Sequence, residues 1–147
     1  MKTTRHIAAS AVAGAAAYKI TGSPQLASAL FLGGVLIDLD HVLDYLILSK
    51  EKPSLRNFFS WFNDIRWRRI YVVFHSYEFY MLFLLLACWL RNDILTGLAV
   101  GIGLHFAMDQ FGISRPINGI RLSWRFYFLA FRCASGFELK KMQVRDS

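Results

Sequence analysis

Residues 81–90 have the sequence MLFLLLACWL, a run that contains no charged side chain. This run lies inside a longer apolar stretch that covers residues 70–90. At about 1.5 Å of rise per residue, a helix over this stretch is about 30 Å long, which matches the hydrocarbon thickness of a bilayer. The stretch therefore predicts a membrane-spanning helix.

Three further stretches share this apolar character, at residues 7–20, 24–48 and 94–112. Ser23-Pro24 is a typical helix start, a capping residue followed by proline at the first helical position. The apolar residues do not alternate as they do in half-buried strands. We expect an all-α fold: a single domain over residues 1–147 that forms an integral membrane bundle of about four transmembrane helices.

The composition supports this class. Hydrophobic residues make up 55% of the chain and charged residues 18%, whereas soluble domains average about 45–50% and about 25%. This much apolar side chain excludes intrinsic disorder, and two cysteines are too few for a disulfide scaffold. Lys2 and Arg5 ahead of an Ala-rich run leave a secretory signal open as an alternative for the first stretch. Its weak hydrophobicity and the presence of His6 favour a retained helix.

The positions of the basic residues predict the orientation in the membrane. If four helices alternate across the bilayer from a cytoplasmic N-terminus, all of the 17 Lys and Arg except Lys19 and Arg91 lie on the cytoplasmic side. The positive-inside rule predicts this asymmetry. We therefore expect a protein of the bacterial cytoplasmic (inner) membrane with both termini in the cytoplasm.

Two stretches outside the apolar segments mix aromatic residues with arginine, at residues 58–70 and 122–133. Such a mixture can bind single-stranded nucleic acid by stacking and phosphate contacts. Beside membrane helices it more often forms an interfacial segment, with rings among the headgroups and guanidinium groups on lipid phosphates. We expect membrane lipid, rather than nucleic acid, as the partner of these segments.

The apolar segments contain ionisable side chains, which are costly in a membrane and usually mark a functional site. All are of metal-ligand type: His6, Asp38, Asp40, His41, Asp44, His75, Glu78, His105 and Asp109. Counted from the cytoplasmic end of each expected helix, they fall in the cytoplasmic half of the bilayer. An antiparallel bundle would bring them to one level, where clustered carboxylates need a cation between them. We expect these groups to converge on a shared metal site.

The local spacing suggests individual roles. His75 and Glu78 are three residues apart and His105 and Asp109 four apart, so each pair would share a helical face. The predicted metal ligands are His6, Asp38, His41, His75, Glu78, His105 and Asp109. Asp40 and Glu78 are the candidate catalytic bases, and Asp40 could also be a ligand if its helix is distorted. Asp44 is expected behind the ligands or near the headgroups.

Mixed imidazole and carboxylate ligands suit Zn²⁺ best, with Mn²⁺ or Fe²⁺ as alternatives. Such an ion lowers the pKa of water towards neutrality, and a nearby carboxylate can accept the proton. Basic residues at the membrane surface favour an anionic substrate. These features predict hydrolysis of a lipid-like ester or phosphoester near the cytoplasmic face.

The same residues, in the same order, resemble the YdjM-like family of predicted membrane-bound metal-dependent hydrolases. A histidine opens the first helix, as His6 does, and residues 34–41 (GVLIDLDH) match the family's G-x-L-P-D-I-D-H motif. His75-Ser76 remains from an H-R-G-x-T-H-S motif, and Gly101, His105 and Asp109 match G-x-x-x-H-x-x-x-D. The resemblance covers residues 5–128, including W-R-F at residues 124–126. It implies an integral membrane, metal-binding hydrolase.

The chain departs from the family pattern at two places. Ile37 replaces the proline of the second motif, and Ile70 and Tyr71 stand where the third has its first His and Arg. A family ligand is therefore missing unless Glu78 substitutes for it. The His and Asp pattern is also loosely similar to that of zinc-dependent phospholipase C, which suggests a phosphodiester.

Two other functions remain open. One is a catalytically degenerate protein that keeps a metal for structure. The other is an ion or proton path, which would need polar groups that continue into the outer leaflet. The region around Cys88 and Trp89 offers none.

Overall fold

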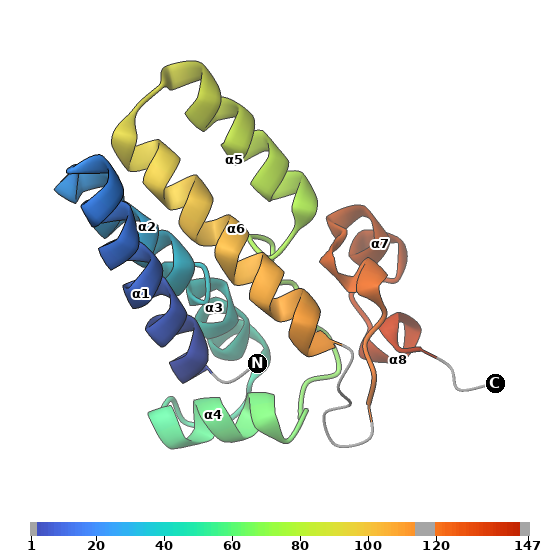
Figure 1. Ribbon diagram of the computed structural model, residues 1–147. Coiled ribbons are helices and arrows are strands. Elements are labelled where there is room, and N and C mark those ends of the chain that lie inside the picture. The colour runs from blue at the N-terminus through green and yellow to red at the C-terminus, as the bar shows by residue number, and fades with distance from the viewer. Residues whose placement is uncertain (1–2, 114–119, 145–147) are drawn as a thin grey trace. The chain divides into compact units, whose positions relative to one another are not determined.

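A computed structural model describes residues 3–113 and 120–144 of the chain. Apart from two isolated β-bridges, the regular structure in these ranges is helical (Figure 1), which confirms the predicted all-α class. The helices are α1 (Thr3–Thr21), α2 (Pro24–Leu36), α3 (Leu39–Leu48), α4 (Leu55–Asn63), α5 (Tyr77–Leu90), α6 (Asp93–Ile113), the 3₁₀ helix η1 (Trp124–Tyr127), α7 (Leu129–Ala134) and α8 (Leu139–Met142). Lys2, Arg115 and Arg145, which contribute to the predicted charge asymmetry, lie outside the described residues.

Two segments of the described chain are long and apolar enough to cross a membrane. They are Pro24–Leu48, which combines α2 and α3, and Asp93–Phe111 in α6. The helix α5 is apolar but shorter, with 14 residues. Several of its large apolar side chains are exposed, among them Leu82 at 70% and Trp89 at 79%. Of the expected four spans, two are therefore supported by length and composition.

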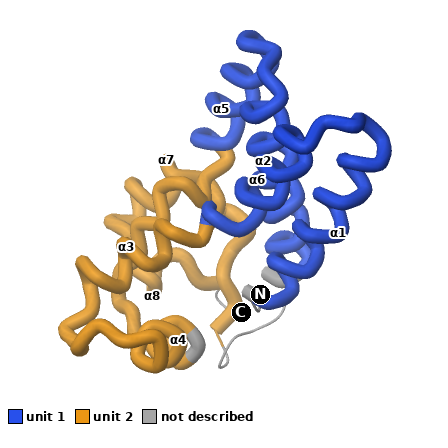
Figure 2. Tube along the Cα trace, turned by 90° about the vertical axis from the view of Figure 1, so that its left-hand side faces the viewer, with its two compact units in different colours: residues 1–37, 78–112 blue, residues 38–77, 113–147 orange. Residues whose placement is uncertain are grey.

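The chain forms two compact units, shown in two colours in Figure 2. Unit 1 contains residues 1–37 and 78–112, and unit 2 contains residues 38–77 and 113–147. The first boundary falls where the helix of the second apolar stretch breaks. Ile37 and Asp38 form a turn between α2 and α3, although no proline is present.

In unit 1, the turn between α1 and α2 follows from its sequence. Gly22 adopts a φ of +68°, which closes α1 with a hydrogen bond from its N–H to the carbonyl of Tyr18. The Ser23 hydroxyl accepts a hydrogen bond from the Leu26 N–H and donates one to Asp93 at the start of α6. These bonds place the ends of α1, α2 and α6 together.

Glycines allow α2 and α6 to pack closely in unit 1. A Cβ atom at Gly33 would collide with the backbone of Leu98, and one at Gly97 or Gly101 with the carbonyls of Leu26 or Leu30. Gly33, Gly97 and Gly101 therefore allow the two backbones to approach closely. This contact sets the position of α6, which carries two of the predicted ligands.

Unit 2 has its own core of aromatic side chains. Tyr45 on α3 packs edge-to-face against Phe58 and Trp61 on α4. The backbone of residues 68–70 pairs with residues 137–139, through hydrogen bonds from Ile70 N–H to the Phe137 carbonyl and from Leu139 N–H to the Arg68 carbonyl. The C-terminal helices are thereby part of the unit that contains α3.

The second aromatic and arginine segment is partly internal rather than interfacial. Phe126, Tyr127 and Arg132 are buried in unit 2, whereas Trp124 and Arg125 are exposed. The expected interfacial role therefore fits Trp124 and Arg125, and the other three side chains belong to the core.

The third apolar stretch becomes helical later than the sequence predicts. Residues 70–76 are not helical, and α5 begins at Tyr77. Val72 has a φ of +35°, in a region that β-branched residues rarely adopt. The cause is tertiary, because the backbone of this loop is hydrogen-bonded to carboxylates on α3.

Candidate metal sites

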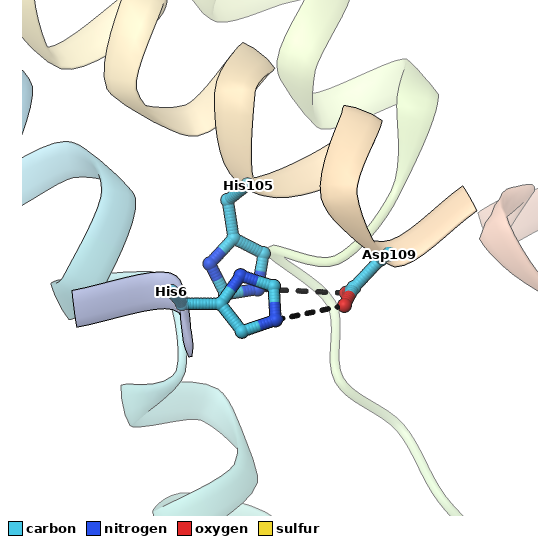
Figure 3. A group of neighbouring side chains, drawn as sticks. All are labelled: His6, His105 and Asp109. Carbon is cyan, nitrogen blue, oxygen red and sulfur yellow. Dashed lines mark ion pairs between the residues drawn. The ribbon is translucent and has the colours of Figure 1, made fainter. Parts of the chain in front are cut away.

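Unit 1 brings together His6 from α1 and His105 and Asp109 from α6 (Figure 3). The Asp109 carboxylate faces the edges of both rings: its Oδ1 is 3.1 Å from His6 Nε2, and its Oδ2 is 3.5 Å from His105 Nε2. The imidazoles stack with their centroids 3.9 Å apart. One ligand atom from each residue lies within 4.8 Å of the others. The expected pairing of His105 with Asp109 across one helical turn is confirmed.

The protonation of His105 follows from its other ring nitrogen. Nδ1 is 2.8 Å from the carbonyl oxygen of Gly34, and because a carbonyl can only accept, Nδ1 carries the proton. Gly34 lies in the last turn of α2, where carbonyls lack a partner within the helix. In the neutral ring, Nε2 then presents a lone pair towards the Asp109 carboxylate. Two facing acceptors need a proton or a metal ion between them.

His6 also supports a ligand site. Its side chain is 3% exposed, and within the part of the chain that the structure describes its Nδ1 has no hydrogen-bond partner. Burying an unpaired ring nitrogen is costly. Nε2 faces Asp109 and is the nitrogen that the ring offers to the group.

Unit 2 contains a second group with the same chemistry: Asp38, His41 and His75. Asp38 Oδ1 is 3.5 Å from His75 Nε2 and 3.9 Å from His41 Nε2. Asp38 occupies the N-cap position of α3, but its side chain makes no capping hydrogen bond. The break between α2 and α3 thus directs this carboxylate to the two histidines. Asp38 and His41 are about one quarter exposed, so the group is more open than the one in unit 1.

Asp40 bonds to Nδ1 of His75, the ring nitrogen that does not face Asp38. Both carboxylate oxygens lie within hydrogen-bond distance of Nδ1, at 2.9 and 3.0 Å, and Oδ2 also accepts the His75 backbone N–H at 3.1 Å. With Nδ1 donating to Asp40, Nε2 is directed to Asp38. A carboxylate behind a histidine in this way fixes the ring and increases its basicity as a metal ligand.

The charges around His75 favour a positive charge at its ring. Burial by itself lowers the pKa of His75, but the hydrogen bonds and negative charges of Asp38 and Asp40 outweigh it and raise the pKa to about 9. Either a proton or a metal ion can supply that charge.

Two further buried residues support the loop that carries His75. Asp44 Oδ2 accepts the backbone N–H groups of Tyr71 at 2.6 Å and Val72 at 3.1 Å. Arg132, which is fully buried, donates to the His75 carbonyl at 3.0 Å. Arg132 is not among the predicted site residues, because an arginine in an aromatic segment has the pattern of a surface cation.

Six of the seven predicted ligands fall into the two groups, three in each. Glu78 belongs to neither group and lies half-buried in the first turn of α5. The prediction that His75 and Glu78 share a helical face was wrong, because His75 precedes α5 and its backbone is held by Asp40. The two groups lie in different units, so their convergence on one shared ion stays a prediction.

Each group offers two imidazoles and one carboxylate, which could hold a metal ion. Sets of this kind bind catalytic zinc and non-haem iron, and with three protein ligands a coordination position stays open for water or substrate. Hard cations such as Mg²⁺ and Ca²⁺ prefer all-oxygen sites. The donor chemistry of both groups therefore fits a borderline transition metal.

Comparison with known proteins gives one result. A family model described as YdjM inner membrane protein matches residues 1–135. No curated protein and no solved structure matches the chain. The matched region includes all residues of both groups, and an inner-membrane location agrees with the two apolar segments.

Proposed function

The chain belongs to the YdjM inner membrane protein family, and from this premise we propose that it is a metal-dependent hydrolase that acts on a lipid-like ester or phosphoester. The observation that carries the proposal is the duplicated set of two histidines and one carboxylate, His6, His105 and Asp109 in one unit and Asp38, His41 and His75 in the other.

The proposed arrangement in the membrane has four spans. The two apolar segments and the family support a membrane location. The helices α1 and α5 would complete the bundle, with both termini and the two groups on the cytoplasmic side. Exposed apolar side chains on α5 fit contact with lipid.

The chain's own residues have distinct roles in this proposal. Each group would hold a divalent ion, of which Zn²⁺ fits best, and such an ion supplies Lewis acidity and lowers the pKa of water towards neutrality. Asp40 orients His75 through its Nδ1 proton, so its proposed role is positioning rather than proton acceptance. Glu78 remains the candidate proton acceptor.

The basic surface of unit 2 supports an anionic substrate. The pairing of residues 68–70 with 137–139 gathers four exposed cations: Arg68, Arg69, Lys140 and Lys141. Glu138 neutralises part of this charge through Lys141 at 3.2 Å and Arg69 at 4.0 Å. The remaining positive charge favours a phosphorylated headgroup at a membrane surface.

The test is to purify the protein in detergent, measure bound metals by mass spectrometry, and assay a fluorescent lipid ester and a chromogenic phosphodiester. We expect bound transition metal and turnover that His105→Ala and Asp38→Asn abolish. The exposed Asp64 provides a matched control, and Asp64→Asn should keep both. A parent protein without metal would contradict the proposal.

A second candidate is a catalytically degenerate member that keeps metal for structure. The absence of the family's first His and Arg at Ile70 and Tyr71 favours it. Metal that is retained without turnover, and whose removal lowers the unfolding temperature, would support this function. Ion or proton conduction would instead appear as an ion flux in liposomes that contain the protein.

A further inference from the structure

The α3 helix has a second buried acid beside Asp40, Asp44, that the proposed chemistry does not use. Asp44 is one turn after Asp40, so both carboxylates lie on one face of α3. Both bond to the loop that precedes α5: Asp44 to the N–H groups of Tyr71 and Val72, and Asp40 to that of His75.

We propose that Asp44 is a positioning residue for His75: by holding Tyr71 and Val72 it fixes the strained loop that presents the His75 ring to Asp38 and His41. The part of this inference that concerns metal rests on the proposed function. The part that concerns the ring of His75 does not.

The strain at Val72 explains why the loop needs this support. Val72 is fully buried and has a φ of +35°, a conformation that persists only where its surroundings enforce it. The Val72 N–H donates to Asp44, and the Val72 carbonyl accepts the His75 N–H at 2.9 Å. The conformation of Val72 therefore links Asp44 directly to the backbone of His75.

Asp40 and Arg132 do not make Asp44 redundant. Asp40 acts on the N–H and ring of His75, and Arg132 acts on its carbonyl. Both contacts lie at the end of the loop. Asp44 instead bonds to the beginning of the loop, directly after Ile70, whose N–H donates to the Phe137 carbonyl.

The geometry provides a conservative variant. A single oxygen, Oδ2, accepts both hydrogen bonds, and the amide oxygen of an asparagine can occupy the same place. Asp44→Asn should therefore preserve the loop, whereas Asp44→Ala removes the acceptor. A role for Asp44 through its charge would affect both variants equally.

The test uses the full chain in detergent, with ¹⁵N-labelled histidine and without added metal. The signal of His75 is assigned as the one that His75→Gln removes. At a pH above the His75 pKa of about 9, where the ring is neutral, we expect the Nδ1-protonated tautomer in the parent protein and in Asp44→Asn, and a mixture of tautomers in Asp44→Ala. At neutral pH, we expect hydrogen exchange followed by mass spectrometry to show faster exchange around Val72 in Asp44→Ala. Asp64→Ala, at an exposed aspartate, should match the parent. An unchanged His75 signal and unchanged Val72 exchange in Asp44→Ala would overturn the proposal.

A second readout uses Co²⁺ as a spectroscopic probe in a His105→Ala background, which leaves the group in unit 2. We expect Asp44→Ala to weaken Co²⁺ binding at least about tenfold and Asp44→Asn to retain it within about threefold. If the background protein binds no Co²⁺ but Asp44→Ala changes the His75 signal, the proposed function fails at this group and the positioning role stands. If Asp44→Ala does not fold, Asp44→Ser, whose shorter side chain cannot hold both N–H groups, takes its place.

Discussion

At the scale of single residues, hydrogen bonds to the second ring nitrogen decide what each histidine offers. The Gly34 carbonyl holds the proton of His105 on Nδ1, and the Asp40 carboxylate does the same for His75. In both rings Nε2 is then directed towards a carboxylate, Asp109 for His105 and Asp38 for His75. A backbone carbonyl on α2 and a carboxylate on α3 thus leave the same ring nitrogen, Nε2, available as a ligand.

The group that accepts the Nδ1 proton is a neutral carbonyl for His105 and a charged carboxylate for His75. This difference is testable. Asp40→Asn keeps an oxygen that can accept the Nδ1 proton but removes its negative charge, so His75 becomes a weaker ligand. We expect Zn²⁺ affinity at the unit 2 group to fall about 10–100-fold. Competition with a fluorescent chelator in a His105→Ala background measures it, with Asp64→Asn as the control. Unchanged affinity would mean that the charge of Asp40 does not act on this group.

At the scale of helices, the approach of α6 to α2 positions the group in unit 1. A Cβ at Gly101 would collide with the Leu30 carbonyl and the Gly34 nitrogen, and Gly34 also holds His105. We expect Gly101→Ala to destabilise the protein by about 1–3 kcal/mol and to weaken metal binding in unit 1. Thermal unfolding and metal titration measure the two effects. Ala107→Val, at an exposed position of the same helix, should change neither.

The break between α2 and α3 gives a prediction about the family proline that this chain lacks. Ile37 has a φ of −59°, which a proline ring accepts. Proline removes the Ile37 N–H, which donates to the Val35 carbonyl, and the buried isoleucine side chain, so we expect Ile37→Pro to cost about 1–2 kcal/mol. Leu43→Pro, at an exposed position inside α3, should cost about 3 kcal/mol. Chemical denaturation in detergent compares them, and equal losses would show that the break does not tolerate proline.

At the scale of the whole molecule, the sequence predicts which segments are helical better than it predicts which distant residues contact one another. Apolar stretches predict the helices, and ionisable groups within them identify six residues of the two groups. Spacing along a helix gives His105 and Asp109, but it cannot show that His6 joins them or that His75 lies beside Asp38 and His41. The loop at residues 70–76 was missed because Val72 is held by Asp44, 28 positions earlier in the chain. Arg132 was missed because its burial depends on the fold of unit 2.

The division into two groups predicts a metal stoichiometry. Each group has two histidines and one carboxylate within 4.8 Å, so each has enough ligands for its own ion. We expect two ions per chain in the parent protein and one in either His105→Ala or His41→Ala. Mass spectrometry of metals against protein concentration gives the count, and the double variant should bind none. If either single variant loses all its metal, the six residues hold one shared centre, as the sequence by itself suggests, and the groups do not act separately.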